Sequence, residues 1–285
     1  MTLIPKTQQK PKVAVYKFSS CDGCQLSLLN LEDELLDLAS AVDIAYFLEA
    51  TRTVKPGPYD IGIVEGSITT PHEAERIQEV RLECKYLIAL GTCATAGGIQ
   101  ALRNFASADE YATTVYAHPE YLSYLEKSTS IAENVPVDLV IWGCPINKYM
   151  LVEVIAALLQ NRRPRFPPSP VCLECKNKGI VCVVVARGLP CLGPVVHGGC
   201  GALCPANGRG CYGCFGPSSV ANFSALVEGM GARDRYPNET AGLLRSFSAH
   251  APAFRIAAEQ ALKLSAEPVP ARPGSIGNLG GKEPL

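Results

Sequence analysis

The chain has 285 residues, enough for two modest domains, and its formal net charge at pH 7 is −1. So balanced a charge gives no electrostatic reason to expect binding to nucleic acid or to an acidic membrane surface. Apolar residues make up 47 % of the sequence and charged residues 19 %. This combination indicates that a large area of the surface is buried against another subunit.

The N-terminus and the cysteines predict a cytoplasmic protein without a membrane anchor. Residues 1–12 contain no apolar core of signal-peptide length, and no stretch approaches the roughly 20 apolar residues needed to cross a bilayer. In the cytoplasm disulfides are disfavoured, and dense cysteines usually bind metal or carry out redox chemistry. A secreted disulfide scaffold is the alternative for thirteen cysteines. Such scaffolds are usually small, whereas this chain first builds an α/β domain.

Strand and helix signals alternate over the first 160 residues. Buried apolar runs predict strands, and apolar residues at helical spacing predict helices. In chain order, the predicted elements are a strand at 13–18, a helix at 25–38, strands at 42–47 and 61–64, a helix at 72–83, strands at 86–90 and 139–142, and a helix at 147–159. Apolar strands separated by helices indicate a parallel sheet covered on both faces. We therefore predict a flavodoxin-like, doubly wound α/β domain over residues 1–165.

A proline-dense stretch at residues 161–170 contains the predicted boundary to a second domain, residues 166–285. Residues 171–218 are rich in Gly, Cys and Pro, with one apolar run at 180–186. We expect little hydrophobic core there, and a small irregular domain that is held together by metal centres. One weak helix is predicted at 253–264, followed by a Pro/Gly-rich C-terminal tail.

Four cysteines that lie far apart in the first domain all follow predicted strand ends. Cys21 and Cys24 come directly after the first strand, and Cys93 and Cys144 each follow a later one. In a doubly wound sheet, ligands bind beyond the carboxyl ends of the strands. We expect the four thiolates to meet there around a 4Fe–4S cluster. A tetrahedral zinc ion is the alternative, although structural zinc usually takes its ligands from local knuckles.

The same strand ends carry glycines and one carboxylate. Gly23, Gly91 and Gly143 have no side chains, so the backbone can approach a bulky cluster and direct its N–H groups at the sulfides. Glu65 ends another strand, in Val-Glu-Gly-Ser. Its carboxylate is a candidate proton relay or partner contact, and it could equally cap the following helix or form an ion pair.

Eight further cysteines crowd into residues 172–214, in two quartets with Cys-x-x-Cys edges. Such knuckles are typical of metal sites, but their spacing does not distinguish zinc ribbons from iron–sulfur cubes. Crossed assignments are open, and we prefer the sequential one because it closes the shortest loops. The first of these quartets is then Cys172, Cys175, Cys182 and Cys191, and the second is Cys200, Cys204, Cys211 and Cys214.

Two remaining residues are expected to stay outside the clusters. His197 lies between the two quartets, where a histidine could replace a thiolate. With eight cysteines available, we expect His197 to donate a hydrogen bond or to face solvent. Cys84 is the thirteenth cysteine, and we expect it to be a buried thiol.

These motifs resemble the small subunit of nickel–iron hydrogenases. The resemblance covers about residues 12–218 and rests on Cys-Asp-Gly-Cys at 21–24, Glu65-Gly, Gly-Thr-Cys93-Ala and Gly-Cys144-Pro, followed by the dense cysteine region. It implies that Cys21, Cys24, Cys93 and Cys144 hold the proximal cluster, beside the nickel–iron site of a large subunit. It also implies that Cys172, Cys175, Cys182 and Cys191 hold the distal cluster, and that Cys200, Cys211 and Cys214 hold the medial one.

Two departures point to the cytoplasmic, multimeric branch of this family, which includes the NADP-linked hydrogenases or sulfhydrogenases. Cys172 stands where membrane-facing members have a histidine, and Cys204 adds a fourth ligand to a site that has three cysteines in those members. Both changes imply three 4Fe–4S clusters with lower potentials. The resemblance then implies electron transfer between the nickel–iron site of a large subunit and a flavin/iron–sulfur diaphorase subunit that uses FAD and NAD(P).

Several alternatives share some of these features. Small subunits of deazaflavin-reducing and heterodisulfide-reductase-linked hydrogenases are similar. The proximal-cluster subunit of respiratory complex I shares only the first domain and has adjacent cysteines in place of Cys21-x-x-Cys24. A zinc-stabilised, non-catalytic interaction module is the rival from another class. Because the sequence has no Gly-x-Gly-x-x-Gly fingerprint, we expect no flavin or nicotinamide site on this chain.

Overall fold

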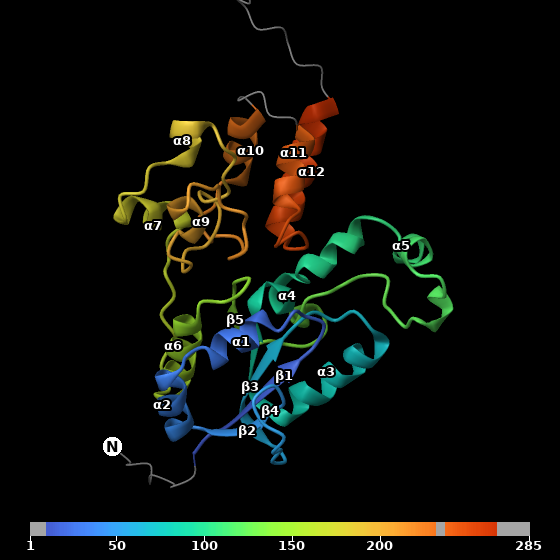
Figure 1. Cartoon of the computed structure of the whole chain (residues 1–285), viewed down its shortest axis with the longest axis vertical. Helices are drawn as coiled ribbons and strands as arrows, with labels where there is room; N and C mark the ends of the chain where they lie inside the picture. The colour runs from blue at the N-terminus through green and yellow to red at the C-terminus, as the bar shows by residue number, and fades with distance from the viewer. Residues whose placement is uncertain (1–9, 232–236, 267–285) are drawn as a thin grey trace, which may run out of the picture.

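The computed structural model describes residues 10–231 and 237–266 (Figure 1). One sheet of parallel strands has the order β2-β1-β3-β4-β5. Its members are β1 (Lys12–Lys17), β2 (Asp43–Phe47), β3 (Tyr59–Glu65), β4 (Cys84–Leu90) and β5 (Leu139–Ile141). This is the flavodoxin-like order, with its switch point between β1 and β3. The predicted fold class is therefore confirmed.

Helices cover both faces of the sheet because successive strand residues point to opposite sides. In β1, Val13 and Val15 join one apolar cluster, and Ala14 and Tyr16 join another. The first cluster contains residues of α1 (Gly23–Leu29) and α6 (Lys148–Leu159), and the second contains residues of α3 (Pro71–Glu83). The predicted helices at 72–83 and 147–159 thus correspond closely to α3 and α6.

The helix predicted at 25–38 is instead two helices, α1 and α2 (Asp33–Ala41). Between them, Leu31 is fully buried, whereas its neighbours Asn30 and Glu32 are exposed. Glu32 has a φ of 57°, which no right-handed helix allows. The break therefore lets one leucine enter the core while its polar neighbours stay in water.

Shorter elements connect β4 to β5 above the sheet. They are α4 (Gly91–Ala96), η1 (Ile99–Phe105), α5 (Ala108–Val115), η2 (Pro119–Tyr121) and η3 (Ile131–Glu133). Because α4 begins directly after the last residue of β4, it holds Cys93 at the carboxyl edge of the sheet.

The cysteine-rich segment has more regular structure than predicted. It contains α7 (Val171–Asn177), α8 (Val183–Arg187) and α9 (Leu203–Ala206), and it is followed by α10 (Phe223–Gly231), α11 (Pro237–Leu244) and α12 (Pro252–Ala266). Figure 1 shows these helices above the part of the sheet that carries α4 and β5. The helix predicted at 253–264 is α12, whereas α10 and α11 were not predicted. The predicted C-terminal tail lies outside the described residues.

The expectation that residues 171–218 contribute little hydrophobic core is wrong. Residues Leu192, Val195 and Phe215 of the cysteine-rich segment are buried together with Val227 of α10 and Phe254 of α12. The late helices therefore supply the apolar surface that the segment itself lacks. The predicted division into 1–165 and 166–285 stays a prediction. Residues 162–169 between α6 and α7 form no helix or strand.

No helix within residues 10–231 and 237–266 combines the length and the apolar character that crossing a bilayer requires.

Candidate metal centres

Four cysteines meet at the carboxyl edge of the sheet, and we call them the first quartet: Cys21, Cys24, Cys93 and Cys144. Cys21 and Cys24 lie at the start of α1, Cys93 lies in α4, and Cys144 follows β5. The pKa of Cys93 is raised to about 11, mainly by burial and in part by the charges of Cys144 and Cys21. Burial also raises the pKa of Cys24, and Glu65 and Cys93 contribute to that rise. Cys93 therefore lies near enough to each of the other three thiols to interact with them electrostatically.

Glycines make room for these sulfurs. A Cβ atom at Gly98 would lie 2.5 Å from Cys93 Sγ, and one at Gly23 would lie 3.4 Å from Cys21 Sγ. A Cβ at Gly91 would overlap Cys24 Sγ. The backbone therefore approaches the thiols as closely as the absence of a side chain permits, which fits a cradle around a compact inorganic group.

Glu65 is buried beneath this edge and accepts hydrogen bonds from the start of α1. The backbone N–H of Cys24 donates to Glu65 Oε1 (2.9 Å), and the side chain of Gln25 donates to Glu65 Oε2 (2.8 Å). The helix that follows Glu65, α3, is capped by Thr70 and not by Glu65, so that expected role is wrong. The Glu65 carboxylate instead caps α1 and holds Cys24 in place. It forms no ion pair within the described residues. Its possible role as a proton relay stays a prediction.

Gln100 is a neighbour of the first quartet that the sequence did not reveal. The Cys93 Sγ–H donates to Gln100 Oε1 (3.5 Å), and Gln100 Nε2 donates to the carbonyl of Ser19 (2.6 Å). The amide therefore bridges η1 and the loop that follows β1. A lone glutamine carries no sequence signal for such a role, since glutamines are common on helix surfaces.

The quartet of Cys172, Cys175, Cys182 and Cys191 is formed by α7, α8 and the loop after α8. The pKa of Cys172 is raised to about 11, mainly by burial and then by the charges of Cys191, Cys175 and Cys182 in that order. A Cβ at Gly193 would lie 3.3 Å from Cys191 Sγ and 3.4 Å from Cys172 Sγ. This quartet therefore has its own glycine contact, as the first one does.

The quartet of Cys200, Cys204, Cys211 and Cys214 lines a cavity of about 330 Å³, together with Cys144. This cavity is much larger than the space one water molecule needs, so it has room for a compact inorganic group. The pKa of Cys214 is raised to about 12, mainly by burial and then by the charges of Cys200, Cys144 and Cys204. The four thiols therefore surround one space that also reaches the first quartet.

The three quartets stand in series. Cys144 of the first quartet raises the pKa of Cys214 in the cavity quartet. The N–H of Cys211 donates to Cys191 Sγ (3.2 Å), which joins the cavity quartet to the one at α7 and α8. The side chain of Thr92 donates to the carbonyl of Cys214 (2.6 Å) and fixes the two halves of the chain at this junction.

Glu174 is a second polar residue, turned inward, that the sequence did not single out. Its carboxylate accepts hydrogen bonds from the N–H groups of Gly199 (2.7 Å) and Ala202 (3.0 Å) and from the Sγ of Cys200 (3.8 Å). It therefore connects α7, which carries one quartet, to the loop that carries the next. The sequence could have pointed to Glu174, because it lies between Cys172 and Cys175 and a side chain in such a knuckle lies beside the metal site.

The other two residues singled out in the sequence lie outside the quartets. Cys84 is buried at the start of β4 and lies against Gly62. His197 is half-buried, and its Nδ1 lies 2.7 Å from the carbonyl of Gly198. This contact matches the hydrogen-bonding role expected for His197.

The residues present fit iron–sulfur clusters. Thiols are the donors that such clusters take, glycines leave room beside the sulfurs of two quartets, and the third quartet lines a cavity. In the described part of the chain, no three His, Cys, Asp or Glu side chains are placed so that they could hold a single metal ion.

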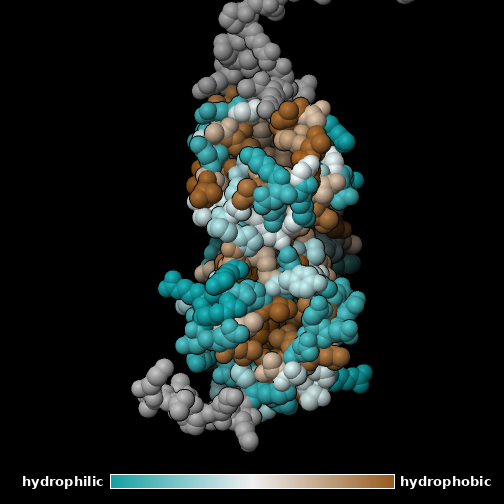
Figure 2. Space-filling view, turned by 90° about the vertical axis from the view of Figure 1, so that its left-hand side faces the viewer, coloured by the Kyte–Doolittle hydropathy of each residue, from teal (hydrophilic) through white to brown (hydrophobic). Residues whose placement is uncertain are grey.

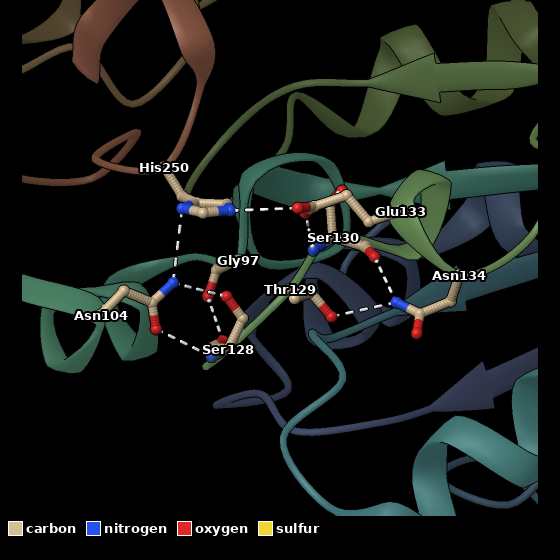
Figure 3. A network of polar contacts seen from close by, with 8 residues as sticks. All are labelled: Gly97, Asn104, Ser128, Thr129, Ser130, Glu133, Asn134 and His250. Atoms are coloured by element: carbon tan, nitrogen blue, oxygen red, sulfur yellow. Dashed lines mark hydrogen bonds and ion pairs between the residues drawn. The ribbon is translucent and has the colours of Figure 1, made fainter. Parts of the chain in front are cut away.

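A polar network joins the C-terminal helices to Gly97 at the end of α4, the helix that carries Cys93 (Figure 3). His250, just before α12, lies 3.1 Å from Glu133 and 3.4 Å from Asn104. Asn104 donates to the carbonyl of Ser128 (2.8 Å), and Ser128 Oγ donates to the carbonyl of Gly97, which follows α4 (3.0 Å). The late helices are therefore fixed to the sheet domain beside the first quartet.

This joint predicts acid-sensitive stability. The hydrogen bond from His250, together with those from Ser130, lowers the pKa of Glu133 from 4.5 to about 2. Because the folded-state pKa is lowered, the stabilisation is complete above pH 4.5 and is lost as the pH falls towards 2. Glu133→Gln should lower the free energy of unfolding by about 1 kcal/mol at pH 7, since the side chain is partly exposed. The deficit should shrink between about pH 5 and pH 3, as measured by urea unfolding. An equal deficit at all pH values would contradict this assignment.

Comparison with known proteins identifies relatives of the chain. Residues 21–158 match the family described as NADH ubiquinone oxidoreductase, 20 Kd subunit. Sulfhydrogenase 2 subunit delta of Pyrococcus furiosus is 37 % identical over 238 residues, which cover 83 % of this chain and 99 % of that protein. A vhu subunit of the F420-non-reducing hydrogenase of Methanocaldococcus jannaschii is 34 % identical, and the match covers 72 % of this chain and 81 % of that protein. The delta subunit of the NAD-reducing hydrogenase HoxS of Cupriavidus necator is 29 % identical, covering 59 % and 88 %.

Solved structures support the fold. A crystal structure of NAD+-reducing [NiFe]-hydrogenase in the H2-reduced state matches with a TM-score of 0.52 and 28 % identity, over 56 % of this chain and 96 % of that one. The actinobacterial-type NiFe-hydrogenase from Ralstonia eutropha H16 matches with a TM-score of 0.52 over 96 % of both chains. At 14 % identity, the latter likeness concerns the fold alone.

Proposed function

The chain belongs to the 20 kDa subunit family of NADH ubiquinone oxidoreductase, as a hydrogenase small subunit, and from this premise we propose which residues carry its electrons and where they go. As a hydrogenase subunit, it serves an enzyme whose active site lies on a partner chain. We propose that it conducts electrons between a nickel–iron large subunit and a flavin-containing partner that acts on NAD(P).

The three quartets are the proposed holders of three 4Fe–4S clusters. Cys21, Cys24, Cys93 and Cys144 would hold the proximal cluster. The medial cluster would be held by Cys200, Cys204, Cys211 and Cys214, and the distal cluster by Cys172, Cys175, Cys182 and Cys191. Each such cluster, when bound, accepts and gives up one electron at a time. The serial contacts between the quartets support this assignment.

The chain's own residues prepare these sites. Burial keeps the free thiols protonated, because it raises the pKa values of Cys93, Cys172 and Cys214. Binding of a cationic cluster would release these protons, since the thiolate is the ligand. Glu65 and Glu174 accept backbone N–H groups and hold the ligand loops in place before any cluster arrives.

Apolar surface on the sheet domain supports a large partner. Helix α2 has no buried residue, and Leu36 is 70 % exposed. Tyr149 of α6 is also exposed. Figure 2 shows hydrophobic side chains gathered on the lower half of the side where α2 and α6 lie in Figure 1. Surfaces of this kind usually mark protein interfaces.

The NAD(P)-linked acceptor is supported by two NAD-reducing relatives. The chain spans 88 % of the HoxS delta subunit and 96 % of the matching chain in the NAD+-reducing [NiFe]-hydrogenase structure. The relatives from F420-non-reducing hydrogenases support the same electron-transfer role with another acceptor. These alternatives differ only in which partner receives electrons from the distal cluster.

The grouping of twelve thiols into three quartets in series carries this proposal. Metal analysis of the native complex, purified through a tag on this chain, tests it. We expect nickel together with about twelve cluster irons per chain, as three 4Fe–4S clusters require.

Hydrogen-dependent reduction of a small dye and of NAD(P) should accompany these metals. Zinc in place of iron would indicate the interaction module instead. Iron without nickel, with no hydrogen-dependent dye reduction, would place the chain in a different oxidoreductase. Dye reduction without NAD(P) reduction would favour the deazaflavin or heterodisulfide alternative.

A further inference from the structure

The surface around the proposed distal quartet carries positive charge that no carboxylate neutralises. Lys176, Lys178, Arg187 and Arg209 are all exposed. None of them forms an ion pair with any described residue. Lys178 donates to the carbonyl of Gly201 (2.6 Å), and Arg187 donates to that of Gly208 (3.4 Å). Backbone carbonyls position these cations but leave their charge in place.

The charge is local, not a property of the whole chain. Residues 171–214 contain four lysines and arginines and a single acidic residue, Glu174, whereas the whole chain has a net charge of −1. Glu174 is turned inward, where its carboxylate accepts the N–H groups of Gly199 and Ala202. The outer surface of this segment is therefore cationic.

Apolar side chains lie among these cations. Val181 is 72 % exposed and Val185 is 83 % exposed, on either side of the exposed Cys182. Next to them is a groove of about 300 Å³ that Lys178, Val181 and Arg187 line together with residues of α9. Figure 2 views the side of the molecule where α7 and α8 lie in Figure 1, and its upper half shows hydrophobic patches beside hydrophilic ones.

We propose that this surface, formed by Lys176, Lys178, Val181, Val185, Arg187 and Arg209, is the docking site of an acidic protein electron acceptor. An apolar centre with a charged rim is the usual anatomy of a protein–protein interface. The four cations then require a partner surface rich in aspartate and glutamate, which they steer and orient. This inference rests on the proposed function and adds to it the chemistry of the partner surface.

A protein fits this surface better than a nucleic acid does. Single-stranded nucleic acids need aromatic side chains on which their bases stack. Residues 171–214 contain a single Phe, Tyr or Trp residue, Tyr212, which lines the cavity of Cys200, Cys204, Cys211 and Cys214 and not the groove beside Lys178. Exposed valines beside a thiol quartet instead match an apolar contact that excludes water between two redox centres.

Carbodiimide cross-linking of the native complex tests the docking site directly. This reagent joins a lysine to a carboxylate only where the two are in contact. We expect cross-links from Lys176 or Lys178 to aspartates or glutamates of an acceptor subunit that is not the nickel-containing subunit. Lys127 and Lys263, which are also exposed, serve as control lysines and should give no cross-link to that subunit. Cross-links only to the nickel-containing subunit, or none from Lys176 and Lys178, would overturn the proposal.

Charge reversal gives a second readout. Arg187→Glu/Arg209→Glu should release the acceptor subunit at low salt and lower hydrogen-dependent reduction of its substrate about tenfold. Arg52→Glu/Arg255→Glu changes the net charge equally at exposed positions elsewhere and should retain both. Equal behaviour of the two double variants would overturn the proposal.

The two hypotheses fail in different ways. Absence of nickel and of hydrogen-dependent dye reduction in the unaltered complex contradicts the proposed function, and the cross-links still show whether an acidic protein docks here. Normal dye reduction together with cross-links that avoid Lys176 and Lys178 contradicts the docking site alone.

Discussion

Cys93→Ala is expected to abolish hydrogen-dependent reduction of NAD(P), while the eight C-terminal cysteines still hold their clusters. Cys93 lies among the other three thiols of the first quartet, and its charge raises the pKa of buried Cys24. Its loss leaves that site with three thiols, whereas the other two quartets keep four each. Because the quartets stand in series, interruption at the first one stops all transfer from the large subunit.

Cys84→Ala is the matched control for this variant. Cys84 is also buried, at 4 % exposure, but it lies at the other end of β4 against Gly62. Its removal should leave activity and cluster content unchanged. Electron paramagnetic resonance of the reduced complexes, together with activity assays, distinguishes the two variants. Full activity of the Cys93→Ala complex would show that Cys93 is not a cluster ligand.

Gly91→Ala is expected to remove about four irons per chain, those of the proximal cluster, and with them the hydrogen-dependent activity. An added Cβ would overlap the sulfur of Cys24, so this thiol must move. Gly91 also has a φ of 82°, and a left-handed conformation costs an alanine about 1–2 kcal/mol. Backbone strain alone would lower stability without removing iron.

Gly179→Ala separates the steric effect from the strain. Gly179 has a φ of 65°, and a Cβ there would meet no atom within 4 Å. This control variant should lose about the same stability in denaturant unfolding but keep its iron and activity. A Gly91→Ala complex with full iron content would mean that Cys24 needs no room at this position.

The sheet could be predicted from the sequence because the apolar runs that indicate its strands are local patterns. Apolar runs such as 61–64 and 86–90 read as buried strands wherever they occur, and they became β3 and β4. The helix at 25–38 was predicted as one because its leucines keep helical spacing. The spacing did not show that Leu31 is fully buried in the core, where its inward turn breaks the helix in two.

The helices α10 and α11 were not predicted, although the structure contains them. Phe223, Leu226, Val227 and Met230 have the spacing of an amphipathic helix, but the surrounding polar and glycine-rich sequence hid it. Their apolar faces have a partner only after the cysteine-rich segment has folded, so no local pattern reveals that they complete its core.

The sequence by itself determined the donors of the candidate sites and their order along the chain, because cysteine spacing and strand ends are visible in one dimension. It also determined that the loops of the first site start at one edge of a parallel sheet. Only the tertiary structure decided that Glu65 and Glu174 brace these loops, that Cys144 and Cys214 face one cavity, and that Lys178, Val181 and Arg187 line one groove. These features depend on contacts between residues far apart in the chain, and no local pattern encodes such contacts.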